Sequence, residues 1–147
     1  MLITCTLKDG IVYVPTIVKT EAGFYMRREP VAVVPAANTD ALWRAFQDVM
    51  AKGNEIVPTP KRDAYPPPVL PKYAGAKNWS AFMKGAFEWA INEDNGNYEV
   101  VPYHKDPEGS QAWVADKERK TQFPVGTARN EVIEQMIKII QTTASTR

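Results

Sequence analysis

The 147-residue chain has very few of the side chains from which most catalytic and metal sites are built. It contains one cysteine, Cys5, and one histidine, His104. A single cysteine excludes an internal disulfide, and one residue of each kind is too few for the three or four close ligands that zinc requires. A nucleophilic pair would need both residues to meet in space, whereas a lone cysteine in an apolar strand is typically a core residue. We therefore expect no catalytic residue, no metal site and no cofactor.

The chain also lacks a strong net charge and long apolar runs. Its formal net charge is +1, which gives no large basic field for attracting nucleic acid or anionic lipid. The sequence has no glycine-rich phosphate loop, and its longest mostly apolar run, residues 31–37, is far too short to cross a bilayer. The first ten residues do not resemble a secretion signal. These features predict a cytoplasmic protein that binds neither nucleic acid nor membrane.

Proline is concentrated between residues 58 and 77, a segment that we call the strap, and Tyr65 and Tyr73 stand among the prolines. Each proline fixes φ and removes a backbone donor, and consecutive prolines favour a stiff polyproline II helix. The strap predicts either an internal brace or, because it contains a PxxP pattern, an exposed ligand for a partner groove. It would join two halves of a single domain, residues 1–57 and 78–147.

The first half of the chain predicts an antiparallel β-meander. Residues 2–35 contain three β-rich runs that are separated by Asp-Gly and Glu-Ala-Gly turns. Pro15 stands inside the second run, which indicates an edge strand or a bulge at that point. The third run contains Pro30, where the strand either breaks or continues.

The rest of the pattern completes an α+β fold, because strands occur in antiparallel groups and do not alternate strictly with helices. Apolar residues spaced three and four apart predict three main helices, over residues 38–53, over residues 78–92 and from residue 127 onward. A second antiparallel hairpin is expected between the last two helices, from residues 97–103 and 110–117.

The most one-sided charge lies between residues 88 and 108, where six acids accompany one base, Lys105. Two interpretations are open, a solvated charged rim and an electrostatic docking surface for a basic partner. Aromatic side chains would add contact area, because protein interfaces are rich in Trp and Tyr. The residues expected to bind a partner are Glu88, Glu93, Asp94, Glu99, Asp106, Glu108, Tyr65, Tyr73 and Trp43.

Three segments, residues 8–25, 69–91 and 123–140, give the chain a likeness to a known group of proteins. In these segments it resembles the small immunity proteins of bacterial contact-dependent growth inhibition and other polymorphic toxin systems. The resemblance implies a cytosolic, non-enzymatic protein that binds one cognate toxin domain and neutralises it. Since that group contains many folds, it implies no role for any single residue.

Two other functions are consistent with the sequence. A small hydrolase could use Glu88, Asp94 or Glu99 with His104, and it would require these side chains to converge in one pocket. An accessory interaction protein could instead present its strap to a partner, and it would require Tyr65, Leu70 and Pro71 to be exposed.

Overall fold

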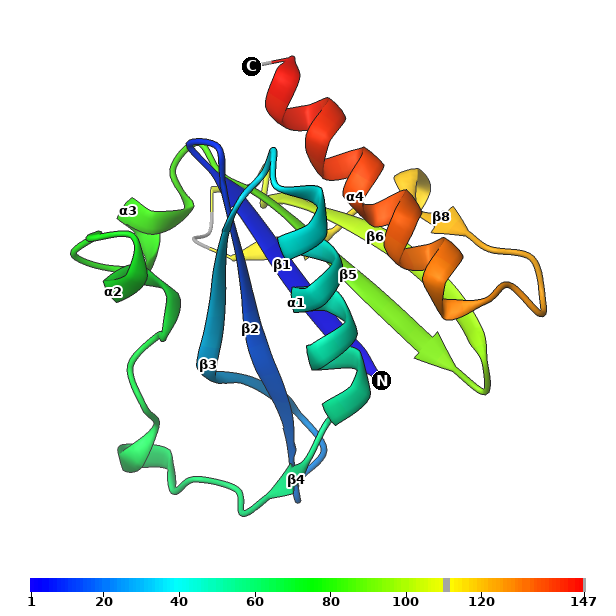
Figure 1. The fold of residues 1–147 in the computed structure, drawn as a ribbon. Coiled ribbons are helices and arrows are strands. Elements are labelled where there is room, and N and C mark those ends of the chain that lie inside the picture. The colour runs from blue at the N-terminus through cyan, green and yellow to red at the C-terminus, as the bar shows by residue number, and fades with distance from the viewer. Residues whose placement is uncertain (110–111, 147) are drawn as a thin grey trace.

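The computed structural model describes residues 1–109 and 112–146 (Figure 1). The strands are β1 (Leu2–Lys8), β2 (Ile11–Thr20), β3 (Tyr25–Pro35), β4 (Ile56–Val57), β5 (Phe87–Asp94), β6 (Asn97–Lys105), β7 (Trp113–Ala115) and β8 (Thr121–Gln122). The helices are α1 (Thr39–Lys52), α2 (Leu70–Tyr73), α3 (Trp79–Met83) and α4 (Arg129–Ser145), with 3-10 turns η1 (Arg62–Ala64) and η2 (Lys117–Arg119).

The strands of the described residues form one eight-stranded sheet. Its main path runs in the order β3-β2-β1-β5-β6-β7, while β4 pairs with β2 and β8 pairs with β6. Every pairing is antiparallel except that of β2 with β4. The predicted α+β class is confirmed, and one sheet contains strands from both halves of the chain.

The N-terminal meander follows from its turns, as predicted. Asp9 and Gly10 both have positive φ, 50° and 78°, which is the geometry of a two-residue turn between right-twisted strands. The register of β2 with β3 shifts between Pro15 and Thr16, so Pro15 marks a bulge. β2 as a whole lies between β3 and β1, but its pairing with β1 covers Ile11 to Tyr13, and Pro15 pairs with Val31 of β3. β3 continues through Pro30, although Glu29 and Pro30 have no register partner in β2.

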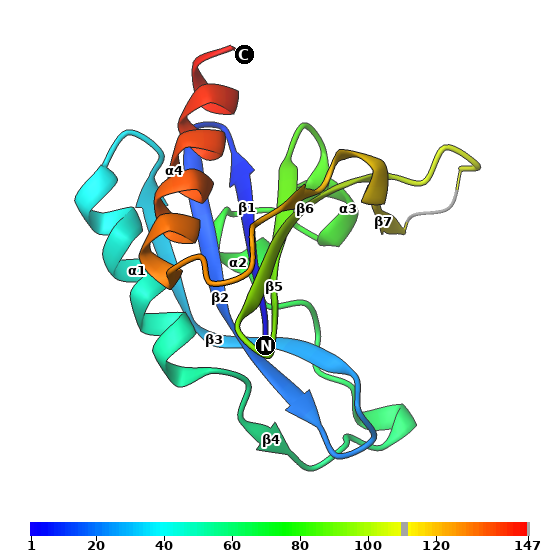
Figure 2. The same cartoon turned by 90° about the vertical axis from the view of Figure 1, so that its right-hand side faces the viewer.

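Two long helices cover one face of the sheet, and Figure 2 shows α1 and α4 side by side there. The predicted ends of α1 are confirmed. The Asn38 side chain accepts a hydrogen bond from the Ala41 N–H at 3.1 Å, and Gly53 follows the helix with φ of 66°. The main core lies beneath both helices. Their buried residues there are Leu42, Ala45, Phe46, Val49, Met50, Val132, Ile133, Met136, Ile137 and Ile140.

The segment 78–92 differs from the single helix that the sequence predicted. Only its first turn is helical, as α3, and the remainder enters β5 in the middle of the sheet. Lys84 is extended, with ψ of 119°, and Gly85 has φ of 72°, a left-handed conformation that ends the helix. Residues 89–91 are all buried because both faces of β5 are covered. Such a continuous apolar run does not distinguish a buried strand from a buried helix.

The second hairpin is present as β6 and β7, which pair in antiparallel register. β7 is shorter than predicted, and residues 110–111 of the predicted strand lie outside the described residues. A further hairpin, β5–β6, was not predicted; Asn95 and Gly96 form its tip, with φ of 52° and 81°. Within the described part of the chain, no helix is long and apolar enough to cross a membrane.

The end of the strap packs on the face of the sheet opposite α1 and α4. Tyr13 alternates with core residues of β2, so its ring points away from these helices, and it forms a second buried cluster with Leu70 and Phe82. Val69 has helical φ and ψ, −77° and −39°, so the polyproline run ends before it. Residues 66–68 are exposed. The last part of the strap is therefore a brace, and its PxxP pattern is not one continuous exposed helix.

Candidate partner-binding groove

The six acidic residues that were predicted as a docking patch do not form one surface. Glu88 is 3% exposed, and its carboxylate accepts a hydrogen bond from the Arg27 guanidinium, with which it forms an ion pair. The same guanidinium stacks over the Trp79 ring, 5.0 Å from the ring centroid. Glu88 is therefore a buried residue that neutralises the partly buried Arg27 guanidinium. Its predicted place in an exposed acidic patch is wrong.

The other five acids lie at opposite ends of β6. Glu93, Asp94 and Glu99 surround the β5–β6 turn, whereas Asp106 and Glu108 lie in the β6–β7 turn. β6 contains nine residues and therefore separates the two groups by about 25 Å. Glu99 has a lysine partner at 3.2 Å, and the Asp106 side chain accepts the Glu108 N–H at 2.9 Å. The acids predicted to form one docking surface therefore form two separate groups, one at each end of β6.

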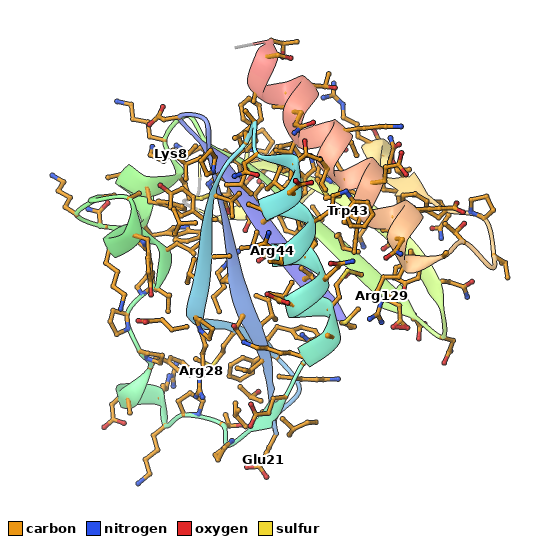
Figure 3. The ribbon with its side chains drawn as sticks, in the orientation of Figure 1. Lys8, Glu21, Arg28, Trp43, Arg44 and Arg129 are labelled. Atoms are coloured by element: carbon orange, nitrogen blue, oxygen red, sulfur yellow. The ribbon has the colours of Figure 1, made fainter. Side chains whose placement is uncertain are left out.

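The three aromatic residues expected to bind a partner differ in exposure. Tyr65 is 54% exposed and packs edge-on against Phe24, with ring centroids 6.1 Å apart. Tyr73 is half-buried and hydrogen-bonded to Glu29. Trp43 is half-buried on the side of α1 that faces α4 (Figure 3). Of the three, Tyr65 offers the most surface to a partner.

The candidate catalytic residues do not converge. Cys5 is 1% exposed beneath α1 and α4, and burial, together with the charge of Glu88, raises the pKa of its thiol. The His104 side chain is 47% exposed near one end of β6, whereas Asp94 and Glu99 lie near the other end. Among the described residues, no group of three or more His, Cys, Asp or Glu side chains could hold a metal ion.

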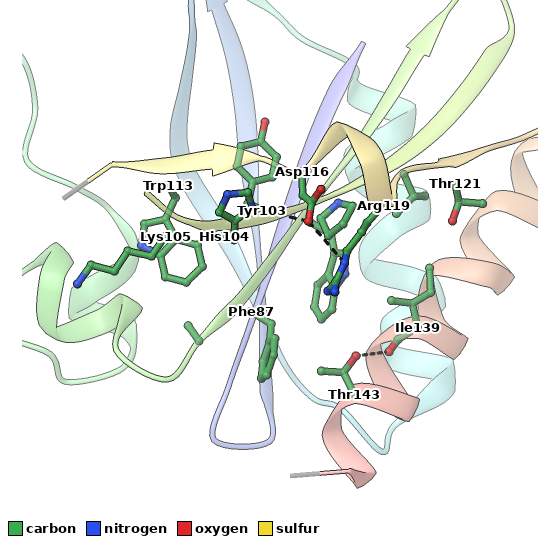
Figure 4. Close-up of a pocket in the computed structure, with 14 residues that line it drawn as sticks. Phe87, Tyr103, His104, Lys105, Trp113, Asp116, Arg119, Thr121, Ile139 and Thr143 are labelled. Atoms are coloured by element: carbon green, nitrogen blue, oxygen red, sulfur yellow. Dashed lines mark hydrogen bonds and ion pairs between the residues drawn. The ribbon is translucent and has the colours of Figure 1, made fainter. Parts of the chain in front are cut away.

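A cavity of about 580 Å³ opens where the start of β5, the β6–β7 hairpin and α4 meet (Figure 4). Phe87 and Trp89 of β5 line it, and their rings stack with centroids 6.2 Å apart. In Figure 4 the Phe87 ring lies between Ile139 and Thr143 of α4 and the side chains of the hairpin. Because Phe87 is 38% exposed, the cavity has an aromatic wall that a partner can reach.

A second cavity of about 390 Å³ adjoins the first, because Lys105 and Trp113 line both. Its other walls come from α3 and the turn that follows it, including Trp79 and Lys84. We call the two cavities together the groove. The groove runs from α3 past Trp113 to α4.

The rim of the groove is basic. It includes Lys84, Lys105 and Arg119, whereas Asp116 is the acid among its described lining residues. Asp116 Oδ2 lies 3.7 Å from Arg119 Nε and 3.8 Å from His104 Nδ1 (Figure 4). The groove therefore combines aromatic walls with an excess of positive charge, which is opposite in sign to the docking surface that the sequence predicted.

Little in the local sequence pattern indicated this groove. Phe87 was placed in a buried helix and Trp113 in an ordinary strand. The groove exists because β5 pairs with β1 and β6, which brings the end of α3 close to β7. Such long-range pairing is not visible in local patterns. A tryptophan close to a predicted turn was the one local signal, since Trp is enriched at interfaces.

No protein-family model matches the chain, and no curated protein matches it by sequence. Among solved structures, its fold is similar to that of NMB0488, a protein of unknown function from Neisseria meningitidis. The TM-score is 0.65 at 14% sequence identity, and the match covers 97% of this chain and 93% of that chain. At this level of identity the likeness concerns the fold alone.

Proposed function

We propose that the chain is a non-enzymatic cytoplasmic binding protein, an immunity protein that binds the toxin domain encoded by a neighbouring gene and neutralises it. The observation that carries this proposal is the groove, with its accessible aromatic walls and charged rim. Interfaces are enriched in aromatic residues and arginine, and the residues that dominate affinity cluster in pockets of this kind. Since its walls stand on β5, β6, α3 and α4, the groove needs little ordering on binding.

A second accessible aromatic surface supports a binding role. It joins the β2–β3 turn to the strap, where Phe24, Tyr25 and Tyr65 are 39%, 40% and 54% exposed. The neighbouring prolines 66–68 restrict the backbone, so this segment loses little conformational entropy when a partner binds. A large protein partner could use this surface in addition to the groove.

The two alternative functions have less support. A carboxylate hydrolase would use Glu88, Asp94 or Glu99 with His104. Asp94 and Glu99 lie near the end of β6 that is opposite His104. The Glu88 carboxylate is buried in its ion pair with Arg27. An accessory protein that presents its PxxP pattern needs Pro71 exposed, but Leu70 and Pro71 are buried. The geometry therefore favours the groove over either alternative.

The test is co-expression with the toxin domain encoded beside this chain. We expect a one-to-one complex in size-exclusion chromatography and survival of cells that express the toxin. Trp113→Ala should weaken the complex by about 30-fold, as expected for a tryptophan that dominates an interface. Ile56→Ala, which truncates a 65% exposed side chain in β4 outside the groove, is the control and should change affinity less than three-fold. A toxin that forms no complex and is not neutralised would refute the proposal.

A further inference from the structure

We propose that the groove binds an acidic segment of the partner protein and takes one large apolar side chain of that segment into the cavity beside Phe87. This inference rests on the proposed function, because it assumes that the partner is a protein. It adds the chemistry of the segment that the groove selects.

The apolar part of the site is the cavity that Phe87, Trp89 and Trp113 line. Its volume of about 580 Å³ exceeds that of any single side chain and lies in the range of ligand pockets. Phe87 is partly exposed although its ring stacks on Trp89. An apolar side chain placed here would cover the exposed side of that stack and remove apolar surface from water.

The charged part of the site is its rim. Lys84 and Lys105 line the groove, and neither ammonium has an acidic partner among residues 1–109 and 112–146. The Lys8 ammonium lies beside Lys84, since it donates to the carbonyl oxygens of Ala81 at 3.4 Å and Lys84 at 2.7 Å. These cations favour carboxylates next to the apolar anchor, on the side toward α3.

Asp116, the acid among the described lining residues, does not neutralise the positive charge of Lys84 and Lys105. The Asp116 carboxylate already faces Arg119 and His104. The nearest acids in sequence, Asp106 and Glu108, lie in the β6–β7 turn, where the Asp106 carboxylate accepts the Glu108 N–H. Neither residue lines the groove.

The same observations favour a protein segment over nucleic acid. Binding along a phosphate backbone requires a longer stripe of basic residues and a basic domain, whereas the chain carries a net charge of +1. The lysines line cavities that also have aromatic walls, which suits an apolar side chain with carboxylates beside it.

A designed peptide tests the inference directly. The probe is a fluorescein-labelled peptide of twelve residues in which Glu and Leu alternate around a central Phe. Its matched control has Lys in place of each Glu, and an oligonucleotide of twelve thymidines tests for nucleic acid. We expect fluorescence anisotropy to show at least ten-fold tighter binding of the acidic peptide than of either control. The indole N–H signal of Trp113 in NMR spectra should shift on titration with it.

Charge reversal on the protein completes the test. Lys84→Glu combined with Lys105→Glu should weaken acidic-peptide binding at least ten-fold, and Lys105→Gln alone should weaken it about three-fold. Lys52→Glu combined with Lys61→Glu changes the net charge equally at exposed positions outside the groove and should have less than a two-fold effect. Circular dichroism melts confirm that all variants fold. Equal binding of the two peptides, tighter binding of the oligonucleotide, or equal effects of the two double variants would overturn the inference.

Failure of this inference is distinguishable from failure of the proposed function. If the toxin domain binds the Lys84→Glu, Lys105→Glu variant as tightly as the wild type, the partner uses another surface, and the immunity function stands. If the acidic peptide binds in the groove but the toxin domain does not bind at all, the chemistry of the groove stands and the function fails.

Discussion

The side chains of β1 that face α1 and α4 are Ile3, Cys5 and Leu7, whereas those that face the strap side are Thr4 and Thr6, and all five are buried. We call the sheet face beneath α1 and α4 the helix face and the opposite one the strap face. The helix face is covered by an apolar core to which the two long helices contribute. The opposite face has polar groups within it, and the hydroxyl oxygens of both threonines lack a hydrogen-bond partner among the described residues. β1 thus has apolar side chains buried on one face and hydroxyl-bearing side chains buried on the other.

The strap face is held together by an ion pair and by short elements. Arg27 of β3 reaches Glu88 of β5 across β2 and β1. Neighbouring strands lie about 4.8 Å apart, so a flat sheet would separate β3 from β5 by about 14 Å, and the two side chains together span the strands between them. Burial raises the pKa of Tyr103, and the negative charge of Glu88 adds to the effect while Arg27 opposes it. The comparison predicts that the helix face contributes most of the stability, and the strap face less.

The largest loss of stability should come from a core substitution on the helix face. Phe46 and Phe82 are both fully buried, the first beneath α1 and the second in the strap-side cluster. Phe46→Ala should lower the free energy of unfolding by about 4 kcal/mol, because the surrounding long helices collapse poorly into the cavity. Phe82→Ala should cost about 2 kcal/mol, since the short α3 can move inward. Denaturant unfolding measures both, and a larger loss for Phe82→Ala would reverse the comparison.

The next largest loss of stability should come from breaking the ion pair between Arg27 and Glu88. Glu88→Ala should lower the free energy of unfolding by about 3 kcal/mol, because it leaves the partly buried Arg27 guanidinium without its carboxylate. Combining Arg27→Met with Glu88→Met should cost less than either single methionine substitution, since no unpaired charge remains. Losses in the double variant that equal the sum of the two single losses would show that the residues act independently.

These two interiors also show what could be predicted from the sequence. The range of helix α1 was predicted, because its apolar spacing, the polar residues 38–40 that can cap its start and Gly53 after its end are all local features. The meander was predicted for the same reason, from the Asp-Gly turn and the alternation around it. Local chemistry was sufficient wherever neighbours in sequence are also neighbours in space.

The strap face and the groove depend on distant contacts, and there the sequence was insufficient. Glu88 appeared to be one of six surface acids, because nothing local indicates that β5 lies between β1 and β6 or that Arg27 reaches it. The groove likewise needs Phe87, Trp113 and α4 to meet. Charge along the sequence was therefore a poor guide to charge on the surface.

A smaller loss of stability should follow from substituting Gly85, where the chain leaves the helical conformation of α3. Gly85→Ala should lower the free energy of unfolding by about 1 kcal/mol, because Gly85 has φ of 72° and a side chain at that φ is strained. Gly85→Asn should lose less, since asparagine tolerates the left-handed region better than alanine. Thermal unfolding of the two variants gives the comparison, and a gain in stability for Gly85→Ala would mean that α3 extends through this position.

The smallest effect concerns the contact that ties α2 to the edge strand β3. The Lys72 ammonium, followed by the Tyr73 hydroxyl, bonds the Glu29 carboxylate and lowers its pKa. A group with a lowered pKa in the folded state contributes stability above its unfolded-state pKa, and this contribution is lost as pH falls through the folded-state value. The NMR titration of the Glu29 carboxyl carbon should therefore have its midpoint below that of an ordinary glutamate. Lys72→Met should move this midpoint upward and increase amide exchange in α2, while leaving exchange in α1 unchanged. An unmoved midpoint would mean that this end of the strap is held by the burial of its apolar side chains, Leu70 and Pro71 among them, and not by the contact with Glu29.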